Sequence, residues 1–308
     1  MKGCRADVFS LRSDIIGNFR CILCGTSRAE VLEEIPTGKR TYYHLRCVQC
    51  GLIFGAPIDR QSIEEMDAFN TQTWEADKFN EPKFLRELDA FRNTFTRQLC
   101  LMEAHGGKGP LLEVGPGLGL FLKVASERGW DCRGVDVSRH AAAFISKVAQ
   151  VPCDHGTIDS VALPQAHYRV VRLRHILEHQ ENPLEFLGHI FRVLTDDGIV
   201  LIDVPNALGT YYSLKTLLSL FSGSRIRHVP LSLPAEHLFA FTPLTLRMLV
   251  EKAGFRVIRL QTACLREKSY FPIRSLSTWR ERFIHLCDLL GKLVNRGSVI
   301  ILCAQKRL

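Results

Sequence analysis

The feature that most constrains this chain is a regular alternation of strand-like and helix-like segments that begins at Leu111. The strand-like segments are short runs rich in Val, Ile and Leu, and the segments between them carry apolar residues at helical spacing. The strand-like runs are 111–115, 131–137, 169–174, 198–204, 255–260 and 298–304, and the helical stretches lie near 118–128, 139–149, 182–194 and 243–253. The alternation predicts a doubly wound α/β fold, in which helices cover both faces of a mainly parallel sheet.

Two long segments interrupt this alternation inside the α/β domain, which we assign to residues 106–308. They are 206–241 and 264–297. Connections of this length are unusual inside a compact domain unless they serve a function. We therefore expect both insertions to act as lids or as walls of a substrate site.

A helical linker or cap, residues 58–105, precedes the α/β domain. Its aromatic and aliphatic residues recur at helical spacing and predict an amphipathic helix over Lys83–Leu101. We expect the apolar face of this helix to pack against the domain that follows.

A glycine-rich loop follows the first strand-like run and opens the next helix. Its pattern is acid-x-Gly-x-Gly-x-Gly, formed by Glu113, Gly115, Gly117 and Gly119. A dinucleotide fingerprint would need its third glycine at position 120, which is Leu120, and no Gly-Lys-Ser/Thr follows as in a phosphate-binding loop. Glycines let the backbone approach a ligand, and the free N–H groups of a helix N-terminus bind a carboxylate as readily as a phosphate.

An acidic residue, Asp136, lies at the end of the second strand-like run, 17 residues after Gly119. A carboxylate at this place can accept hydrogen bonds from both hydroxyls of a ribose. The alternative is an ordinary strand-to-helix turn with a helix-capping aspartate. Because the loop and the acid occur together and in order, we favour a ligand site.

Four cysteines in the N-terminal module, residues 1–57, predict a metal site. They form two CxxC pairs separated by 22 residues: Cys21, Cys24, Cys47 and Cys50. A glycine follows each pair and permits a left-handed turn. Four thiolates match the tetrahedral coordination of zinc and leave no open position, so we expect a zinc ribbon with a structural Zn²⁺ ion. Chance pairs in a reduced core, or a redox pair, are the alternatives.

The net charge of +8 would by itself suggest a nucleic acid or an anionic surface as partner. The whole excess lies in residues 256–308, whereas residues 1–255 are balanced. The ribbon region, 18–58, holds five basic and three acidic residues, and zinc-bound thiolates would cancel that excess. We interpret the basic C-terminal region as a wall that faces an anionic acceptor, as a subunit or membrane-surface contact, or as a solvated basic helix.

Composition and cysteine content indicate the class of protein and its cellular compartment. Hydrophobic residues make up 46% and charged residues 23% of the chain, as in globular proteins, and no run of about 18 apolar residues predicts a transmembrane helix. The chain has 11 cysteines, an odd number, and no apolar signal segment is visible at the N-terminus. These features favour a reducing compartment, and we expect a cytoplasmic protein.

The motifs from Leu111 to Lys306 resemble those of the class I S-adenosylmethionine-dependent methyltransferases. LLEVGPGLGLFL resembles their first motif, GVDVS their second, and RHILEHQENPLEFLGHIFRVLTDDGIVLIDVPN the region around their fourth and fifth strands. A preceding CxxC–CxxC module is similar to that of a subgroup of small-molecule methyltransferases, which includes sugar C-methyltransferases. The resemblance implies a Rossmann-like sheet of seven strands whose last strand is antiparallel and lies between the fifth and the sixth.

The resemblance also assigns ligand contacts. The three glycines of the loop would wrap the methionine end of S-adenosylmethionine, and Glu113 would orient the loop and the amino group. Asp136 would bind the ribose, and Val137 would pack on the adenine. The remaining implied contacts are Gly156, Thr157 and Ile158 at the adenine edge, and Arg174 and His175 near the sulfonium. One departure is that Arg172 and Arg174 interrupt a strand that is usually apolar.

The cluster His175, Glu178 and His179 forms the pattern H-x-x-E-H and is our candidate for catalysis. His179 could be a general base oriented by Glu178. The side chains could instead only cap and brace the next helix. A third alternative is that all three hold a divalent ion that fixes a hydroxylated acceptor, as in the quinone-type O-methyltransferases that this region resembles. A zinc protease is the fourth, and the short spacing to Pro183 speaks against it.

These observations favour methyl transfer to a small-molecule acceptor, such as a sugar, a nucleotide-sugar or a related hydroxylated metabolite. An RNA methyltransferase that grips RNA with its ribbon is the alternative. Against it stand the balanced charge of the ribbon region and the absence of an Asn/Asp-Pro-Pro-aromatic motif after the fourth strand. A non-catalytic, cofactor-binding scaffold is the third hypothesis, and the intact loop and Asp136 speak against it. The sequence leaves the oligomeric state open.

Overall fold

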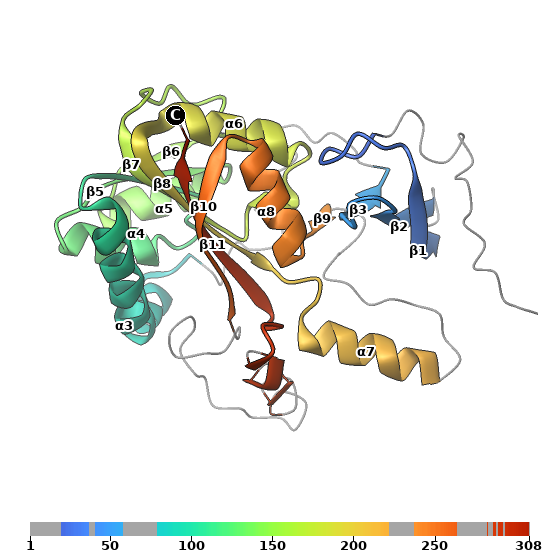
Figure 1. The fold of residues 1–308 in the computed structure, drawn as a ribbon. Coiled ribbons are helices and arrows are strands. Elements are labelled where there is room, and N and C mark those ends of the chain that lie inside the picture. The colour runs from blue at the N-terminus through green and yellow to red at the C-terminus, as the bar shows by residue number, and fades with distance from the viewer. Residues whose placement is uncertain are drawn as a thin grey trace, which may run out of the picture.

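The computed structural model describes residues 20–36, 41–57, 79–221, 237–263, 282, 286–287, 289–291 and 293–307 (Figure 1). Parts of the predicted linker, 58–78, and of both insertions, 222–236 and most of 264–285, lie outside the described residues. The expectations for those segments therefore remain expectations.

A seven-stranded sheet forms the main body of the protein, and its strand order is β10-β11-β8-β7-β4-β5-β6. The strands are β4 (Pro110–Val114), β5 (Asp131–Asp136), β6 (Cys153–His155), β7 (Tyr168–Arg174), β8 (Leu194–Pro205), β10 (Phe255–Ala263) and β11 (Val299–Lys306). The strands from β8 to β6 pair in parallel, and β11 is antiparallel to both β8 and β10. This confirms the predicted doubly wound sheet, including the antiparallel last strand between the fifth and the sixth.

Local sequence signals explain where the helices begin. Asn182 and Thr242 accept hydrogen bonds from backbone N–H groups three residues on, and a proline follows each. The helices around the sheet are α4 (Leu120–Glu127), α5 (Arg139–Phe144), which continues as the π-helical turn Ile145–Ala149, α6 (Pro183–Val193) and α8 (Pro243–Lys252). Their bounds agree with the predicted helical stretches to within a few residues.

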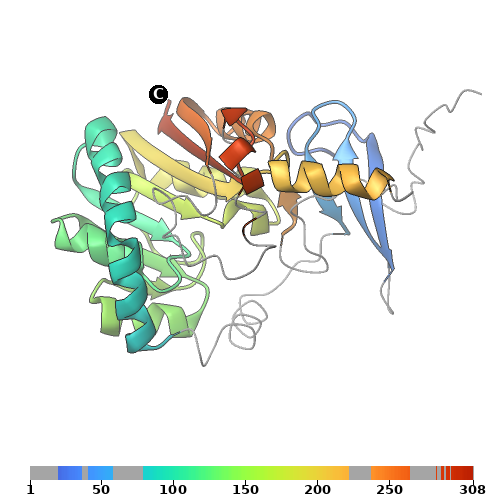
Figure 2. The ribbon, with the colours of Figure 1, turned by 90° about the horizontal axis from the view of Figure 1, so that it is seen from below.

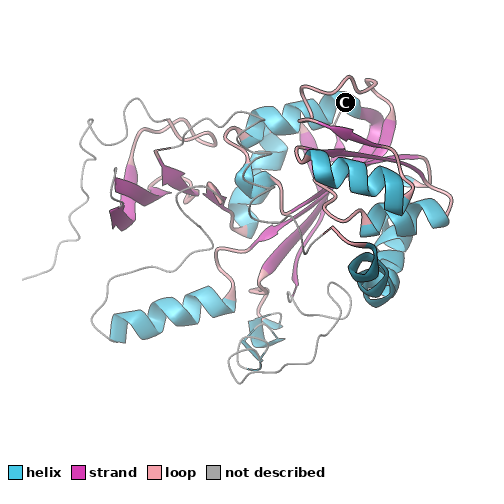
Figure 3. Ribbon diagram, turned by 180° about the vertical axis from the view of Figure 1, so that it is seen from behind, coloured by secondary structure: helices cyan, strands magenta, loops and turns pink. Residues whose placement is uncertain are grey.

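Each face of the sheet packs against its own set of helices (Figures 1 and 3). Leu111, Val170 and Ile199 point toward one side and join a core with α3, α4 and α5. Their neighbours along the strands point toward the other side and join a core with α6 and α8. The alternation of side chains along a strand produces these two cores, and the result is a three-layer α/β/α domain.

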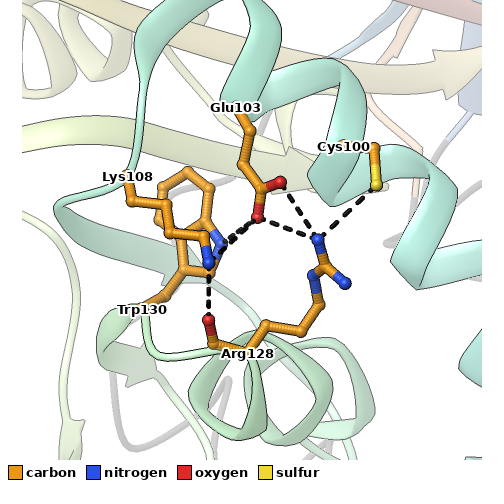
Figure 4. A network of polar contacts seen from close by, with 5 residues as sticks. All are labelled: Cys100, Glu103, Lys108, Arg128 and Trp130. Atoms are coloured by element: carbon orange, nitrogen blue, oxygen red, sulfur yellow. Dashed lines mark hydrogen bonds and ion pairs between the residues drawn. The ribbon is translucent and has the colours of Figure 1, made fainter.

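The long helix α3 (Glu81–Gly106) belongs to this body (Figure 2). Its residues Phe84, Leu88 and Phe95 are buried against α4 and the sheet, so the predicted amphipathic helix is confirmed. Its C-terminal end is fixed by a polar network (Figure 4). The guanidinium of Arg128 donates to both oxygens of Glu103, at 3.0 and 3.1 Å, and the indole N–H of Trp130 donates to the same carboxylate at 3.3 Å.

A smaller sheet lies beside the main one, with strand order β1-β2-β3-β9. Strands β1 (Ala29–Pro36), β2 (Thr41–Cys47) and β3 (Ile53–Ala56) come from the N-terminal module, and β9 (Phe239–Ala240) comes from the insertion 206–241. The helix α7 (Thr210–Phe221) of the same insertion extends away from the main sheet (Figures 1 and 2). The insertion thus contributes a strand to the ribbon, which the sequence does not predict.

In the part of the chain that the structure describes, no helix combines the length and hydropathy that crossing a bilayer requires.

Candidate functional site

The glycine-rich loop lies between β4 and α4, at the carboxyl edge of the parallel strands. Gly115, Gly117 and Gly119 all have positive φ angles, of 66°, 59° and 71°. A Cβ atom at Gly115 would overlap Cδ1 of Ile176, whereas none of the described atoms lies within 4 Å of a Cβ placed at Gly117. The backbone at Gly117 is therefore open to close approach, and glycine is needed at Gly115 for both its conformation and its contact.

Asp136 links three segments that the sequence assigns to one ligand. One of its carboxylate oxygens accepts from the backbone N–H of Ser138 at 2.9 Å, and the other lies 3.4 Å from the backbone N–H of Gly117. Its backbone carbonyl accepts from Gly156, at 2.9 Å, in the loop after β6. The glycine loop, the end of β5 and the Gly156–Ile158 loop thus form one continuous edge.

This edge fits an adenosine ligand with a charged amino acid end. The open backbone at Gly117 and the N-terminus of α4 offer N–H donors for a carboxylate. The carboxylate of Asp136 lies at the end of β5 on this edge, and Val137 follows it in the chain. The contacts implied for these residues, and for Thr157, Ile158 and Arg174, remain predictions.

Arg172 occupies the interior below the glycine loop. Its guanidinium pairs with the carboxylate of Glu113 and lies 4.1 Å from the ring centroid of Phe121, on the α3 and α4 side of the sheet. One oxygen of Asp203 lies 3.9 Å from it. Burial raises the pKa of Glu113, and the charge of Arg172 opposes this shift. The sequence treats Arg172 as an interruption of an apolar strand, and in the structure it compensates a buried acid.

The predicted catalytic cluster lies in the turn after β7, beside the glycine loop. His175 has a positive φ angle of 53°, and the short helical turn Leu177–His179 follows it. The Nδ1 atom of His175 lies 3.2 Å from Oε1 of Glu178, whose side chain is only 1% exposed. His175 therefore helps to hold the carboxylate of Glu178, and the general-base role of His179 stays a prediction.

His237, which the sequence did not single out as a ligand, joins this cluster from the other insertion. Its ring lies 4.7 Å from that of His179, centroid to centroid. The potential ligand atoms of Glu178, His179 and His237 all lie within 4.8 Å of one another, and His175 is not a member of this group. The tertiary fold thus places His237, 58 positions after His179, beside two of the three predicted residues, and the expected set of His175, Glu178 and His179 stays a prediction.

Leu238 connects this cluster to the ribbon through its backbone. Its N–H donates to the carbonyl of Glu178 at 2.8 Å, and its own carbonyl accepts from the N–H of Gly55 at 2.8 Å. Gly55 lies in β3, the strand that pairs with β9. Leu238 of the insertion therefore links the turn with the H-x-x-E-H pattern to the ribbon.

The four cysteines of the two CxxC pairs come together in the ribbon. The sulfur atoms of Cys21 and Cys50, and those of Cys24 and Cys47, are 3.4 Å apart, and all four lie within 4.8 Å of one another. The glycines after the pairs, Gly25 and Gly51, have φ angles of 74° and 77°, as the predicted left-handed turns require. The arrangement fits one tetrahedral metal ion.

The electrostatics of the tetrad favour a thiolate at one position. Burial raises the pKa of the Cys47 thiol, but the backbone N–H groups of Cys50 and Gln49 and the neighbouring thiols outweigh it and lower that pKa to about 7. Burial raises the pKa of Cys21.

Lys252 at the end of α8 donates to the carbonyls of Ile22 and Leu23, each at 2.8 Å, and so ties the first CxxC turn to the α/β domain.

Comparison with known proteins supports the same fold. A family model described as a methyltransferase domain matches residues 84–260, more than half of the chain. A Mycolicibacterium smegmatis protein named "Probable S-adenosylmethionine-dependent methyltransferase" is 27% identical over 99 residues. That match spans 32% of this chain and 38% of the relative, so the chain covers well under two thirds of this curated relative's length.

Two solved structures show the likeness of fold. The first is a chain of a Haloferax volcanii complex between a methyltransferase activator and a protein described as a methyltransferase. It has a TM-score of 0.52 and 13% identity, and the match covers 80% of this chain and 98% of that one. The second is the cyclase SpnF, with a TM-score of 0.51, 16% identity, and coverage of 82% and 98%.

The strand order and the family match together define a class I S-adenosylmethionine-dependent methyltransferase domain. The chain belongs to the methyltransferase-domain family whose model spans residues 84–260. The N-terminal module with the four cysteines precedes the matched region.

Proposed function

We propose that the protein transfers a methyl group from S-adenosylmethionine to a hydroxylated small molecule, such as a sugar, a nucleotide-sugar or a related metabolite. The observation that carries the proposal is the joining of the glycine loop, Asp136 and the Gly156 loop into one edge. Family membership supports the reaction class, and the acceptor class rests on the H-x-x-E-H turn beside that edge.

The residues at this edge would hold the methyl donor. Backbone N–H groups of the glycine loop and of the start of α4 would bind its carboxylate. Asp136 would accept from the ribose hydroxyls, and Val137 and the Gly156–Ile158 loop would enclose the adenine. The buried Arg172–Glu113 pair fixes the strand end from which the loop departs, so Glu113 supports the loop from below.

S-adenosylmethionine supplies a methyl group activated by a positive sulfur, and the protein has to position the acceptor and deal with its proton. The turn with His175, Glu178 and His179 follows β7, next to the loop that would hold the donor. An acceptor oxygen in this region meets imidazole and carboxylate groups that can bind it and take its proton. These three residues are our proposed catalytic groups.

A zinc ion bound by Cys21, Cys24, Cys47 and Cys50 would be structural in this proposal. Four cysteine ligands leave no position for water or substrate. The geometry of the four sulfur atoms supports this assignment.

RNA is the less favoured acceptor. The described ribbon strands carry ion pairs such as Arg46–Glu30, rather than an unbroken basic surface. Most of the basic residues of the insertion 264–297 lie outside the described residues, so their expected role as an anionic-acceptor wall remains a prediction.

The proposal is tested in two steps. Calorimetry on the purified protein should show binding of S-adenosylmethionine, and no binding would contradict the proposed reaction. A screen with labelled methyl donor across sugars, nucleotide-sugars, phenols and RNA should then give transfer to a hydroxylated small molecule. Transfer to RNA alone would contradict the proposed acceptor class and would agree with the proposed reaction.

A further inference from the structure

We propose that Glu178, His179 and His237 form a second metal site, which binds a divalent cation between the α/β domain and the strand that docks the ribbon. The location of the acceptor beside this cation rests on the proposed function. The metal site itself rests on the arrangement of the three side chains and on a buried carboxylate oxygen of Glu178.

The three residues converge from two distant parts of the chain. Glu178 and His179 belong to the turn after β7, and His237 directly precedes β9. Their potential ligand atoms lie within 4.8 Å of one another, a spread that allows one ion to contact all three. The backbone bond from Leu238 to Glu178, at 2.8 Å, holds the two segments in this register.

A buried carboxylate oxygen provides an independent reason for a cation here. Glu178 is fully buried, and its Oε2 atom has no hydrogen-bond partner in the part of the chain that the structure describes. Burial of an uncompensated carboxylate oxygen is unfavourable, and a bound cation would offset that cost. The other oxygen, Oε1, faces Nδ1 of His175 at 3.2 Å, so His175 orients the carboxylate from outside the ligand set.

The donor set indicates which ions suit the site. Two imidazoles and one carboxylate suit divalent ions such as Mn²⁺, Fe²⁺, Co²⁺ and Zn²⁺, and they leave open coordination positions. The tetrad of thiols in the ribbon is closed and sulfur-only, so the two sites differ in both chemistry and access. In this arrangement His179 would be a metal ligand rather than a general base. An acceptor hydroxyl would take an open position, where the ion would lower the pKa of the hydroxyl and its proton would pass to water.

The site also gives the ribbon a role near the reaction. His237 enters the cluster on the segment that continues into β9, and β9 pairs with β3 of the ribbon. The carbonyl of Leu238 accepts from Gly55 of β3. Metal binding therefore requires the ribbon-docked position of this segment, and the ribbon acts as a positioning element for His237.

Binding of Mn²⁺ to the zinc-replete full chain tests the proposal, because Mn²⁺ favours oxygen and nitrogen ligands over thiolates. Electron paramagnetic resonance and calorimetry should show about one Mn²⁺ per chain. His237→Ala and Glu178→Gln should each weaken binding by a factor of ten or more. His189→Ala, which removes a histidine of α6 outside the cluster, should leave the affinity unchanged.

Thermal unfolding separates a metal site from a structural brace. Mn²⁺ should raise the melting temperature of the wild type in a concentration-dependent way, and the rise should disappear in His237→Ala. Equal Mn²⁺ affinity in the wild type and in His237→Ala would overturn the proposal, as would no binding at millimolar Mn²⁺. Binding of S-adenosylmethionine is measured in parallel: its absence in the wild type contradicts the proposed function, while Mn²⁺ binding decides the metal site separately.

Discussion

The guanidinium of Arg172 forms an ion pair with the carboxylate of Glu113 inside the sheet, where both side chains are at most 3% exposed. The two residues are register partners on the adjacent parallel strands β7 and β4. Phe121 lies below the guanidinium and Asp203 beside it. The pair lies where the glycine loop leaves β4, so its ion pair supports the loop that would hold the methyl donor.

Replacing Arg172 with Met should destabilise the protein by about 3–5 kcal/mol, because it leaves the carboxylate of Glu113 buried without compensation. Chemical denaturation measures this change. The double variant Arg172→Met with Glu113→Gln should recover part of the loss, since it neutralises one of the two buried carboxylates that face Arg172 and leaves the other, Asp203. Arg169→Met on the same strand removes a partly exposed pair with Asp197, at 3.1 Å, and should cost less than about 1 kcal/mol. Equal losses of stability in Arg169→Met and Arg172→Met would contradict the prediction that burial makes the Arg172 pair more important.

Replacing Asp136 with Ala should weaken binding of S-adenosylmethionine by more than about tenfold, because the carboxylate would lose two hydroxyl hydrogen bonds. Calorimetry measures the affinity, and a thermal scan checks that the protein is still folded. Asp131→Ala, at the exposed start of the same strand, is the matched control and should bind normally. An unchanged affinity in Asp136→Ala would contradict the prediction that Asp136 binds the ribose.

Replacing Gly115 with Ala should reduce both stability and binding of the methyl donor. The residue has a positive φ, which costs an alanine about 1–2 kcal/mol, and its Cβ would overlap Cδ1 of Ile176. Gly129→Ala has the same backbone strain, with a φ of 82°, but its Cβ meets none of the described atoms within 4 Å. Adding Ile176→Val should restore part of what Gly115→Ala loses. If both glycine variants behave alike, the contact with Ile176 is unimportant.

Metal analysis of the purified protein should give about one tightly held zinc per chain. Cys47→Ser should lose it and lower the melting temperature, because one of four ligands is removed. The control is Cys100→Ser, an exposed cysteine on α3, which should keep the zinc. A stable Cys47→Ser protein with unchanged zinc content would contradict the tetrad as the binding site.

Replacing Lys252 with Met should loosen the ribbon from the α/β domain. The ammonium group donates to two carbonyls of the first CxxC turn, and its loss should cost about 1 kcal/mol. Limited proteolysis should cut the chain faster between the ribbon and α3, whereas Lys147→Met at the surface beyond α5 should not change the rate. Identical digestion patterns would show that β9 alone docks the ribbon.

Local patterns predicted the fold correctly in most respects. The apolar runs, the capping residues Asn182 and Thr242 and the glycines after the helices act over a few residues, so their positions could be read without the fold. The CxxC pairs and the glycine loop likewise carry their geometry within short segments. The bounds of the strands differ from the prediction by one to four residues, since hydrogen bonds to neighbouring strands decide where a strand ends.

Relations between distant residues needed the tertiary structure. His237 lies in an insertion that has no regular pattern, and no sequence signal assigns it to Glu178 and His179. The sequence could only mark it as a histidine before a predicted helix. The burial of Arg172 was equally hidden, because a charged residue in a strand is read as a surface residue or as a departure from the pattern.

The sequence by itself determined the class of fold, the order of the strands' motifs, the cysteine tetrad and the glycine loop with Asp136. Each of these depends on spacing along the chain. Only the tertiary structure decided that β9 completes the ribbon sheet, that Leu238 joins the ribbon to the turn of Glu178, and that Arg172 compensates Glu113. The physical reason is that pairing across the interior depends on which faces of remote elements meet, and spacing along the chain does not encode that.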